Sequence, residues 1–436
     1  GTIHGQARLS KYAGGLGVDW SSVRATGGYI KGTNGNSSGL VPWLKIFNDT
    51  LVAVNQGGKR KGAGCSYLEP WHLDIDDFLD LRKNTGDDRR RCHDMNTALW
   101  VCDEFMVAVS KKRDWYLFDP AECSELHEVY GKEFSKVYKK YKKMADNGEI
   151  ENFRIVDAKD LWKKILTALY ETGHPWITFK DAANIRYSNK HEGVVHSSNL
   201  CTEIFLHTKP TKYDEGKVIE VGETAVCNLA SVNLASHLKV RTIDWKKLQQ
   251  TVETAIRGLD SVINLNFYPT EEAKKSNLTH RPIGLGIMGT HDVLHKLGIP
   301  YNSKDAVLIC GKIQEFISLH AIKTSALLAK EKGEYPSFEG SEWSNGRFPI
   351  DTYCDLMNQR CSQKLENVYK KEDFETFEEW EEVRLLVSEH GMRNSNVMAI
   401  APTATISYIQ GCSQSVEPDY SVLYVYSTLS GEFTMV

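Results

Sequence analysis

The chain has 436 residues, and its 53 Lys+Arg and 57 Asp+Glu give a formal net charge of −4. This near balance gives no electrostatic reason to expect a nucleic acid as partner. No apolar run approaches the roughly 20 residues needed to span a bilayer, and the first residues lack the apolar core of a signal peptide. We therefore expect a cytoplasmic protein that does not enter a membrane.

The ten cysteines are scattered along the chain, with no C-x-x-C pair and no dense short-spaced set. This spacing favours neither a zinc site nor a disulfide scaffold. We expect thiols that a reducing cytoplasm keeps reduced, some of them with a chemical role, and we expect no metal ligands in this chain.

Two glycine-rich stretches lie near the start of the chain. Residues 1–42 are rich in Gly, Ser and Asn, with Lys11 and Arg24 among them. Glycines let backbone amides approach a ligand closely, and the two cations could pair with phosphates. A glycine-rich loop alone is weak evidence for a binding site, and ordinary turns are the favoured explanation of this composition. Residues 55–64 hold three cations and four glycines, in a loop that could bind an anion or lie in solvent.

Apolar periodicity gives the expected elements. It predicts helices over residues 41–54, 74–82, 125–151, 158–172, 245–264, 289–297, 304–333 and 377–391. Strand patterns occur at 65–70, 97–101, 176–179, 225–231, 281–289 and 397–401, and residues 207–222 indicate a hairpin. The lysine-rich run 125–151 is expected to be a solvated surface helix. This alternation of strands and helices favours an α/β architecture.

The last of these strands leads into a loop of small and hydroxyl-bearing residues, Pro402-Thr403-Ala404-Thr405. Such a loop can cradle a phosphate where it opens a helix. The alternative is a Ser/Thr helix cap that binds no ligand.

The segment Ser197–Ile204 places an amide, a thiol and a carboxylate at alternate positions: Asn199, Cys201 and Glu203. If the backbone is extended, these three side chains point the same way and line one face of a pocket. The carboxylate could take a proton from a polyol, the amide could orient its hydroxyls, and the sulfur could do one-electron chemistry. A polar turn with an inert buried cysteine is the alternative.

Eight segments, taken together and in order, resemble the large catalytic subunit of ribonucleotide reductase. They are Ser10–Gly15, Ile30–Pro42, Gln56–Arg60, Leu68–His72, Ser198–Ile204, Val226–Leu229, Arg281–Gly286 and Ala401–Thr405. The resemblance implies a ten-stranded α/β barrel made of two five-stranded parallel halves. A central finger loop would carry the active cysteine. Our reading of strands and helices is compatible with such a barrel but would not have found it.

The resemblance also implies a role for each matching residue. Cys201 matches the cysteine that becomes a thiyl radical and takes the 3′ hydrogen of the ribose. Glu203 matches the carboxylate that accepts the 3′-hydroxyl proton, and Asn199 matches the amide that holds the ribose hydroxyls. Cys227 matches one of two cysteines that close into a disulfide as they supply two electrons.

Further positions match binding residues of the family. Gly14, Gly15 and Pro402, Thr403, Ala404 and Thr405 match substrate contacts, the last four around the diphosphate. Gln56 and Arg60 match positions that touch the substrate base or phosphate when an effector is bound. Lys11 and Arg24 match positions near an allosteric nucleotide, ATP or a deoxynucleoside triphosphate.

The segment Asn199-Leu200-Cys201-Thr202-Glu203 resembles the corresponding segment of the oxygen-dependent class I enzymes. In that class a separate metal-containing small subunit generates the radical; adenosylcobalamin is the second choice of radical source. The glycyl-radical class lacks the carboxylate. The resemblance further implies a ribonucleoside diphosphate substrate, thioredoxin or glutaredoxin as reductant, and a homo-oligomer.

Several family features are not found in these residues. They are the N-terminal ATP-binding module, the strand with the redox partner of Cys227, the tyrosine pair that relays the radical, and the cysteine tail. We therefore expect residues 1–436 to be the barrel core, as a split-gene product with companion chains or a segment of a longer polypeptide. The competing hypothesis is a catalytically incompetent nucleotide-binding scaffold that assembles with other reductase chains. A nucleotide-dependent dehydrogenase is a distant third, because it would need a G-x-G-x-x-G motif after the first strand, where residues 13–17 read A-G-G-L-G with no acidic residue about 20 positions further on.

Overall fold

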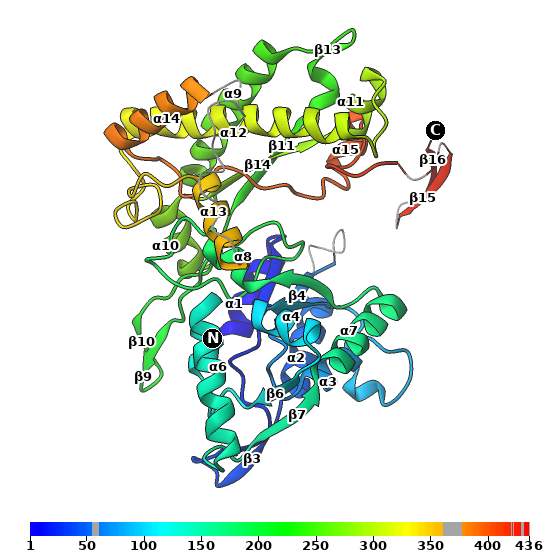
Figure 1. Cartoon of the computed structure of the whole chain (residues 1–436), viewed down its shortest axis with the longest axis vertical. Coiled ribbons are helices and arrows are strands. Elements are labelled where there is room, and N and C mark those ends of the chain that lie inside the picture. The colour runs from blue at the N-terminus through cyan, green and yellow to red at the C-terminus, as the bar shows by residue number, and fades with distance from the viewer. Residues whose placement is uncertain (55–60, 361–376, 420, 422, 429–430, 436) are drawn as a thin grey trace. The chain divides into compact units, whose positions relative to one another are not determined.

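The computed structural model describes residues 1–54, 61–360, 377–419, 421, 423–428 and 431–435. The chain folds as two compact units (Figure 1). Unit 1 comprises Gly1–Val226, Phe267–Thr279 and Glu339–Phe374, and unit 2 comprises Cys227–Asn266, His280–Phe338 and Glu375–Val436.

Unit 1 is built on a parallel four-stranded sheet. Its strands lie in the order β1 (Gly15–Asp19), β4 (Ala63–Leu68), β5 (Asn96–Val101) and β8 (Trp176–Phe179). Parallel neighbours need crossover connections, and these contain helices α2 (Val41–Ala53), α3 (Ile75–Asp80), α4 (Asp103–Ser110) and α7 (Ala158–Thr172). The predicted α/β architecture with a parallel sheet is confirmed.

Helix α7 illustrates how local sequence sets an element of unit 1. The Asp157 carboxylate caps its start by accepting the N–H of Asp160, and Gly173 ends it with a φ of 70°. Leu161 and Ile165 lie on the buried face between these caps. The predicted bounds of 158–172 are therefore confirmed.

Unit 1 contains further elements outside this sheet. They are α1 (Thr2–Lys11), the hairpin β2 (Thr26–Ile30) and β3 (Gly35–Ser38), η1 (Asp88–Arg90), the pair β6 (Asp114–Phe118) and β7 (Phe153–Asp157), α5 (Glu125–Glu128), α6 (Gly131–Asp146), α8 (Lys180–Ile185), the hairpin β9 (Lys212–Asp214) and β10 (Lys217–Glu220), α10 (Glu271–His280) up to Thr279, and α13 (Pro349–Arg360).

Two predictions in this unit are corrected. Residues 2–11 form a helix where the glycine-rich start indicated turns. Residues 125–151 form two helices, and α6 is not merely a solvated surface helix because it buries Phe134, Tyr138 and Tyr141. Lysines occupy only the outer face of α6, so the composition of this run concealed an amphipathic helix.

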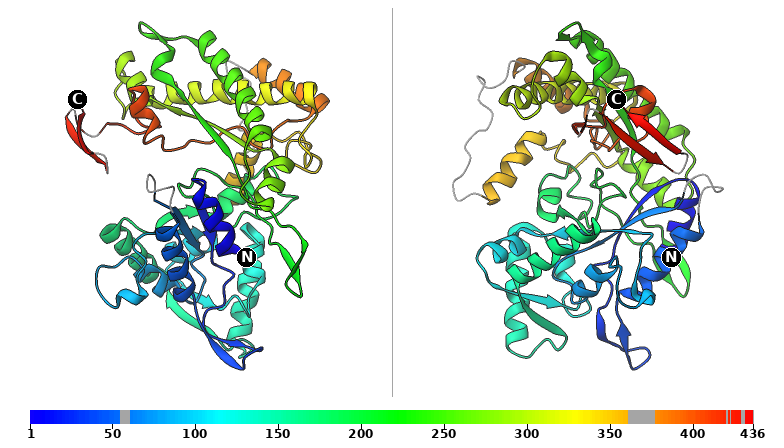
Figure 2. Two further views of the ribbon diagram at one scale, coloured as in Figure 1. Left: turned by 180° about the vertical axis from the view of Figure 1, so that it is seen from behind. Right: turned by 90° about the vertical axis from the view of Figure 1, so that its right-hand side faces the viewer.

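Unit 2 contains a parallel strand pair, β11 (Asn228–Asn233) and β14 (Ile283–Met288). Helices α9 (Trp245–Leu265) and α12 (Lys304–Lys332) pack on each other, and α9 covers both strands (Figure 2). The predicted strand at 397–401 is reduced to a parallel bridge between Leu285 and Met398. The unit also contains η2 (Leu234–His237), β12 (Leu238–Lys239), β13 (Thr242–Ile243), α11 (Thr290–Leu297), α14 (Phe377–His390), α15 (Ile406–Gln410), β15 (Tyr424–Thr428) and β16 (Gly431–Met435).

Among the described residues, every helix is either too short or too polar to cross a membrane.

Candidate active site

The segment that carries Asn199, Cys201 and Glu203 is a turn in unit 1. The side-chain oxygen of Asn199 accepts hydrogen bonds from the backbone N–H groups of Glu203 and Ile204, at 3.2 and 3.3 Å. Thr202 has a φ of 68°, which a β-branched residue adopts only when its surroundings enforce it. The expected extended conformation is therefore wrong, because the Asn199 amide folds the segment back on itself.

The turn presents its sulfur outward and encloses part of its carboxylate. Cys201 is exposed, whereas Glu203 is half-buried. The Oε2 atom of Glu203 is enclosed and has no hydrogen-bond partner within the described part of the chain. A buried carboxylate oxygen that lacks a donor is costly, so this atom is suited to accept a proton from a ligand.

The base of the turn is closed by hydrogen bonds. The Ser198 hydroxyl donates to the carbonyl of Ile204 at 2.6 Å. Upstream, the Val195 carbonyl accepts hydrogen bonds from the Trp100 indole at 3.2 Å and from the Asn184 amide at 2.9 Å. The turn is therefore a loop anchored on both β5 and α8.

Tyr67, on β4, holds the turn at the residues on either side of Cys201. Its hydroxyl donates to the Asn199 carbonyl at 2.7 Å and lies 2.8 Å from the Thr202 hydroxyl, so its two contacts flank Cys201. Burial raises the pKa of the Tyr67 hydroxyl, and nearby Cys65 adds to this effect, so the hydroxyl keeps its proton and remains a donor. The resemblance did not point to Tyr67. The alternation of strand β4 could have indicated it, because it puts Cys65 and Tyr67 on one face.

Two glycines of β1 let the strand approach this turn. A Cβ atom on Gly17 would lie 1.7 Å from the Ser198 carbonyl oxygen, and one on Gly15 would lie 3.2 Å from the Cβ of Leu200. Gly15 thus lies beside the turn that carries Cys201. A Cβ atom on Gly14 would lie 3.1 Å from the carbonyl oxygen of Leu9.

Cys227 lies in unit 2, immediately before β11. It is half-buried, and a Cβ atom on Gly284 of the neighbouring strand would lie 3.5 Å from its sulfur. Cys227 was expected inside a strand, and the strand instead begins at the next residue. The thiol is therefore located at the end of the parallel pair rather than within it.

The predicted phosphate loop is also in unit 2. Thr403 has a φ of 56°, and its hydroxyl accepts the N–H of Ser415 at 2.9 Å, while Ala404 and Thr405 are exposed. The hydroxyl of Ser407 is enclosed without a hydrogen-bond partner among the described residues. Pro402, Thr403, Ala404 and Thr405 thus form a strained, locally braced turn that opens α15.

Lys11 and Arg24, the two cations predicted to lie near an effector nucleotide, are in different segments of unit 1. Lys11 ends α1 and lies 5.9 Å from the centroid of the Tyr12 ring. Arg24 follows β1, and its Nε–H is enclosed with no acceptor in the described ranges. Gln56 and Arg60 lie outside the described residues.

The motif Leu68–His72 proves to be structural. Lys180 and Glu69 form an ion pair at 2.8 Å with both side chains fully buried, and the Trp71 indole donates to Glu69 at 2.7 Å. The His72 ring lies 2.8 Å from the Val23 carbonyl. These residues fix the end of β4, the strand that supplies Tyr67.

The whole chain is similar to known proteins of one family. A family model described as the barrel domain of ribonucleotide reductase matches residues 1–436. The chain is 54% identical over 433 residues to the ribonucleoside-diphosphate reductase subunit alpha of Chlamydia muridarum. It is 43% identical over 475 residues to the subunit alpha of Helicobacter pylori strain J99, and 40% identical over 456 residues to the large subunit of Arabidopsis thaliana.

These alignments cover 99%, 99% and 100% of this chain, but 40%, 58% and 52% of the respective relatives. The chain thus spans only part of the length of the curated relatives that it matches.

Proposed function

Because the chain belongs to the ribonucleotide reductase barrel-domain family, we propose that it supplies the catalytic site that reduces ribonucleoside diphosphates to deoxyribonucleotides. One observation carries the proposal. In a single tight turn, an exposed Cys201 thiol lies two residues from a Glu203 carboxylate whose enclosed Oε2 lacks a partner among the described residues. A hydroxyl-bearing ligand would supply the missing donor.

The proposed chemistry divides the work among these groups. Cys201, as a thiyl radical, takes the 3′ hydrogen of the ribose, and Glu203 accepts the 3′-hydroxyl proton. The resulting ribose radical expels the protonated 2′-hydroxyl as water. Two electrons are then needed, and Cys227 with a second cysteine supplies them as a disulfide forms. Asn199 orients the ribose hydroxyls through its amide N–H group while its oxygen holds the turn.

Each group of predicted binding residues is assigned within its own unit. We assign the diphosphate to the turn formed by Pro402, Thr403, Ala404 and Thr405, supported by the enclosed Ser407 hydroxyl. We assign the ribose to the surface beside Gly14 and Gly15. Arg24, with an Nε–H that lacks an acceptor in the described residues, and Lys11 would bind the triphosphate of an ATP or deoxynucleotide effector. Gln56 and Arg60 would touch the substrate when the effector is bound.

The proposed architecture is a ten-stranded barrel, formed by two five-stranded parallel halves around a finger loop that bears Cys201, with residues 1–436 as its core. The parallel sheet of unit 1 and the parallel β11–β14 pair, extended by the bridge to Met398, support this proposal. The loop character of residues 197–204 supports the finger.

The proposed partners follow from the chemistry. A radical must reach Cys201, so we propose a metal-containing small subunit as its source, with companion reductase segments and a homo-oligomeric assembly. Adenosylcobalamin is the alternative source. Thioredoxin or glutaredoxin would reduce the disulfide in the cytoplasm.

The decisive experiment is Cys201→Ser in the complete enzyme, assembled with its small subunit. We expect deoxynucleotide formation to fall by roughly 10³-fold or more, because serine cannot carry the radical at an accessible potential. Nucleotide binding should be unchanged. Cys354→Ser is the matched control, since Cys354 is half-buried in α13 and remote in sequence from the turn.

Normal turnover by the Cys201→Ser variant would refute the proposal. A wild-type assembly that binds nucleotide and yet forms no product would instead support the alternative of an incompetent scaffold.

A further inference from the structure

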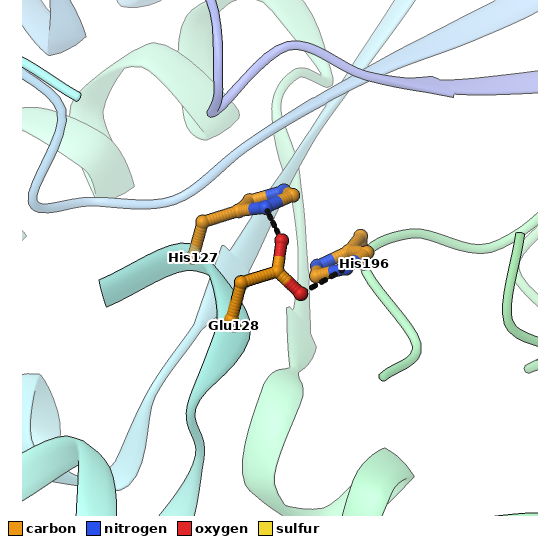
Figure 3. A group of neighbouring side chains, drawn as sticks. All are labelled: His127, Glu128 and His196. Carbon is orange, nitrogen blue, oxygen red and sulfur yellow. Dashed lines mark hydrogen bonds and ion pairs between the residues drawn. The ribbon is translucent and has the colours of Figure 1, made fainter. Parts of the chain in front are cut away.

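Four ionisable side chains of unit 1 meet beside the start of the catalytic turn. The His127 ring contacts the Asp19 carboxylate through Nε2 and the Glu128 carboxylate through Nδ1, both at 2.8 Å. The other oxygen of Glu128 lies 3.5 Å from Nε2 of His196 (Figure 3). We call Asp19, His127, Glu128 and His196 the histidine cluster.

The two imidazole rings in this cluster are stacked. Their centroids lie 3.7 Å apart, and their planes differ by 6°. Nitrogen lone pairs lie in the plane of each ring, so a cation in the plane of one ring lies outside the plane of the other. The ligand atoms are close enough to hold a metal ion, but this stacking is unfavourable for shared coordination. We therefore interpret the cluster as a set of groups that share protons, and not as a metal site.

The two rings hold different charges. His127 has a carboxylate at each ring nitrogen, which is the arrangement of a doubly donating imidazolium. Burial opposes that charge, but the Asp19 carboxylate and the hydrogen bonds to Asp19 and Glu128 outweigh it and raise the pKa of His127 to about 10. Burial lowers the pKa of His196, and the charge on His127 lowers it further against the opposing effect of Glu128.

The surroundings penalise a proton on His196. Its Nδ1 is enclosed with no hydrogen-bond partner in the described residues, so an N–H there would lack an acceptor. Two cations already face the ring. One is His127, stacked upon it, and the other is the Lys180 ammonium, which donates to the His127 carbonyl at 3.0 Å.

The carboxylates nearby are already engaged. Asp19 and Glu128 bond His127, and Glu69 holds Lys180. Only the side chain of Glu128 is well exposed, so protons reach the cluster from that side.

The cluster is mechanically connected to the turn. His196 precedes Ser198 by two residues, and the Ser198 carbonyl rests on Gly17 of β1. Asp19, which anchors His127, is the last residue of that same strand. A displacement of the His196 ring therefore acts on the segment whose far side is closed by the Ser198–Ile204 hydrogen bond.

We propose that His196 is a positioning residue for Cys201. In its neutral form it stacks on His127 and fixes the start of the catalytic turn. When it gains a proton, the two stacked cations repel each other, the rings separate and the turn loosens. The proposal relies on the proposed function only in naming Cys201 as the catalytic thiol.

Hydrogen exchange of peptides that cover residues 197–204 tests this, without substrate or radical. After correction for intrinsic rates, protection of the Glu203 and Ile204 amides should stay constant between about pH 7.5 and pH 6.5. It should then fall by up to roughly tenfold for each pH unit below about 6.5, the ordinary pKa of an imidazole released from the stack. His196→Gln, which cannot be charged, should keep full protection throughout. His196→Lys, a permanent cation, should lack it throughout.

His174→Gln is the matched control, because His174 is another half-buried histidine whose pKa burial lowers. This control should retain the pH response of the wild type. In the complete enzyme, His196→Gln should lose the acidic limb of the kcat profile with KM unchanged.

Three outcomes would overturn the proposal. They are a wild-type turn whose protection does not change with pH, a His196→Gln variant that keeps the pH response, and zinc uptake by the wild type that this variant abolishes. Because exchange is measured without turnover, these outcomes are independent of the Cys201→Ser test. An inactive assembly with a pH-responsive turn would disprove only the proposed function.

Discussion

At the scale of single residues, the turn depends on one phenol. Tyr67→Phe removes only the hydroxyl and leaves the Asn199 carbonyl and the Thr202 hydroxyl without their partner. Such a loss costs roughly 1–3 kcal/mol when the remaining groups are buried. Since these groups flank Cys201, we expect lower kcat with little change in KM, together with faster hydrogen exchange of residues 199–204.

Tyr116→Phe is the comparison for this prediction, because the Tyr116 hydroxyl bonds Asp146 elsewhere in unit 1. That variant should leave exchange of the turn unchanged. Equal exchange in wild type and Tyr67→Phe would show that the phenol does not hold the turn.

At the scale of elements, the close approach of β1 to the turn leads to a further prediction. A methyl group on Gly17 would lie 1.7 Å from the Ser198 carbonyl oxygen, which no rotamer change relieves because both groups are backbone-fixed. Gly17→Ala should therefore displace the turn and lower the thermal midpoint, and it should abolish most of the proposed reductase activity when the complete enzyme is assayed.

Gly35→Ala in β3 is the matched substitution in a strand, where the added Cβ meets only the Thr33 hydroxyl at an ordinary 3.6 Å. We expect its free energy of unfolding to stay within about 1 kcal/mol of that of the wild type. If calorimetry shows the two alanine variants to be equally stable and active, β1 does not support the turn as described.

Elements also show what the sequence could predict. Helix 158–172 was predictable because its caps and apolar period are local. The turn at 197–204 was not, because the side-chain bonds of Asn199 and the Tyr67 phenol outweigh the alternation of polar residues. The identities of Asn199, Cys201 and Glu203 still support the resemblance on which the proposed chemistry rests, since a resemblance depends on residue types rather than on backbone shape.

Two further features could not be predicted from the sequence, because they too depend on contacts between distant residues. The strand expected at 397–401 pairs through a single bridge, because its apolar pattern does not reveal how many neighbours it finds. The histidine cluster joins residues 19, 127, 128 and 196, which no spacing rule connects. Contacts between distant parts of the chain decided both features.

At the scale of the whole molecule, buried histidines in both units predict how stability depends on pH. Burial lowers the pKa of five of them, two in unit 2 and three in unit 1: His237, His320, His72, His174 and His196. Each is neutral in the fold and gains a proton on unfolding below about pH 6.5. The unfolded state then binds more protons, so the free energy of unfolding falls as the pH falls.

Three groups, His127, Glu69 and Asp181, have raised pKa values in the fold and therefore stabilise it more as the pH falls. Asp19 and Glu128 keep His127 charged in the fold, and burial raises the pKa of the Glu69 and Asp181 carboxyls. His127 contributes stability fully below about pH 6.5, and loses it only as the pH rises through about 10. Between pH 7 and 5 the contribution of His127 changes little, and we expect the five neutral histidines to outweigh these three groups.

We therefore expect the thermal midpoint to fall as the pH is lowered from about 7 to about 5, a window in which most ordinary carboxylates do not titrate. Calorimetry at several pH values measures the slope, which should be smaller in His72→Gln than in the wild type even though that variant is less stable overall. A midpoint that is constant or rises over this window would show that the buried histidines are not held neutral. The same result would weaken the assignment of a neutral His196 beside the catalytic turn, since its charge state rests on the same cost of burial.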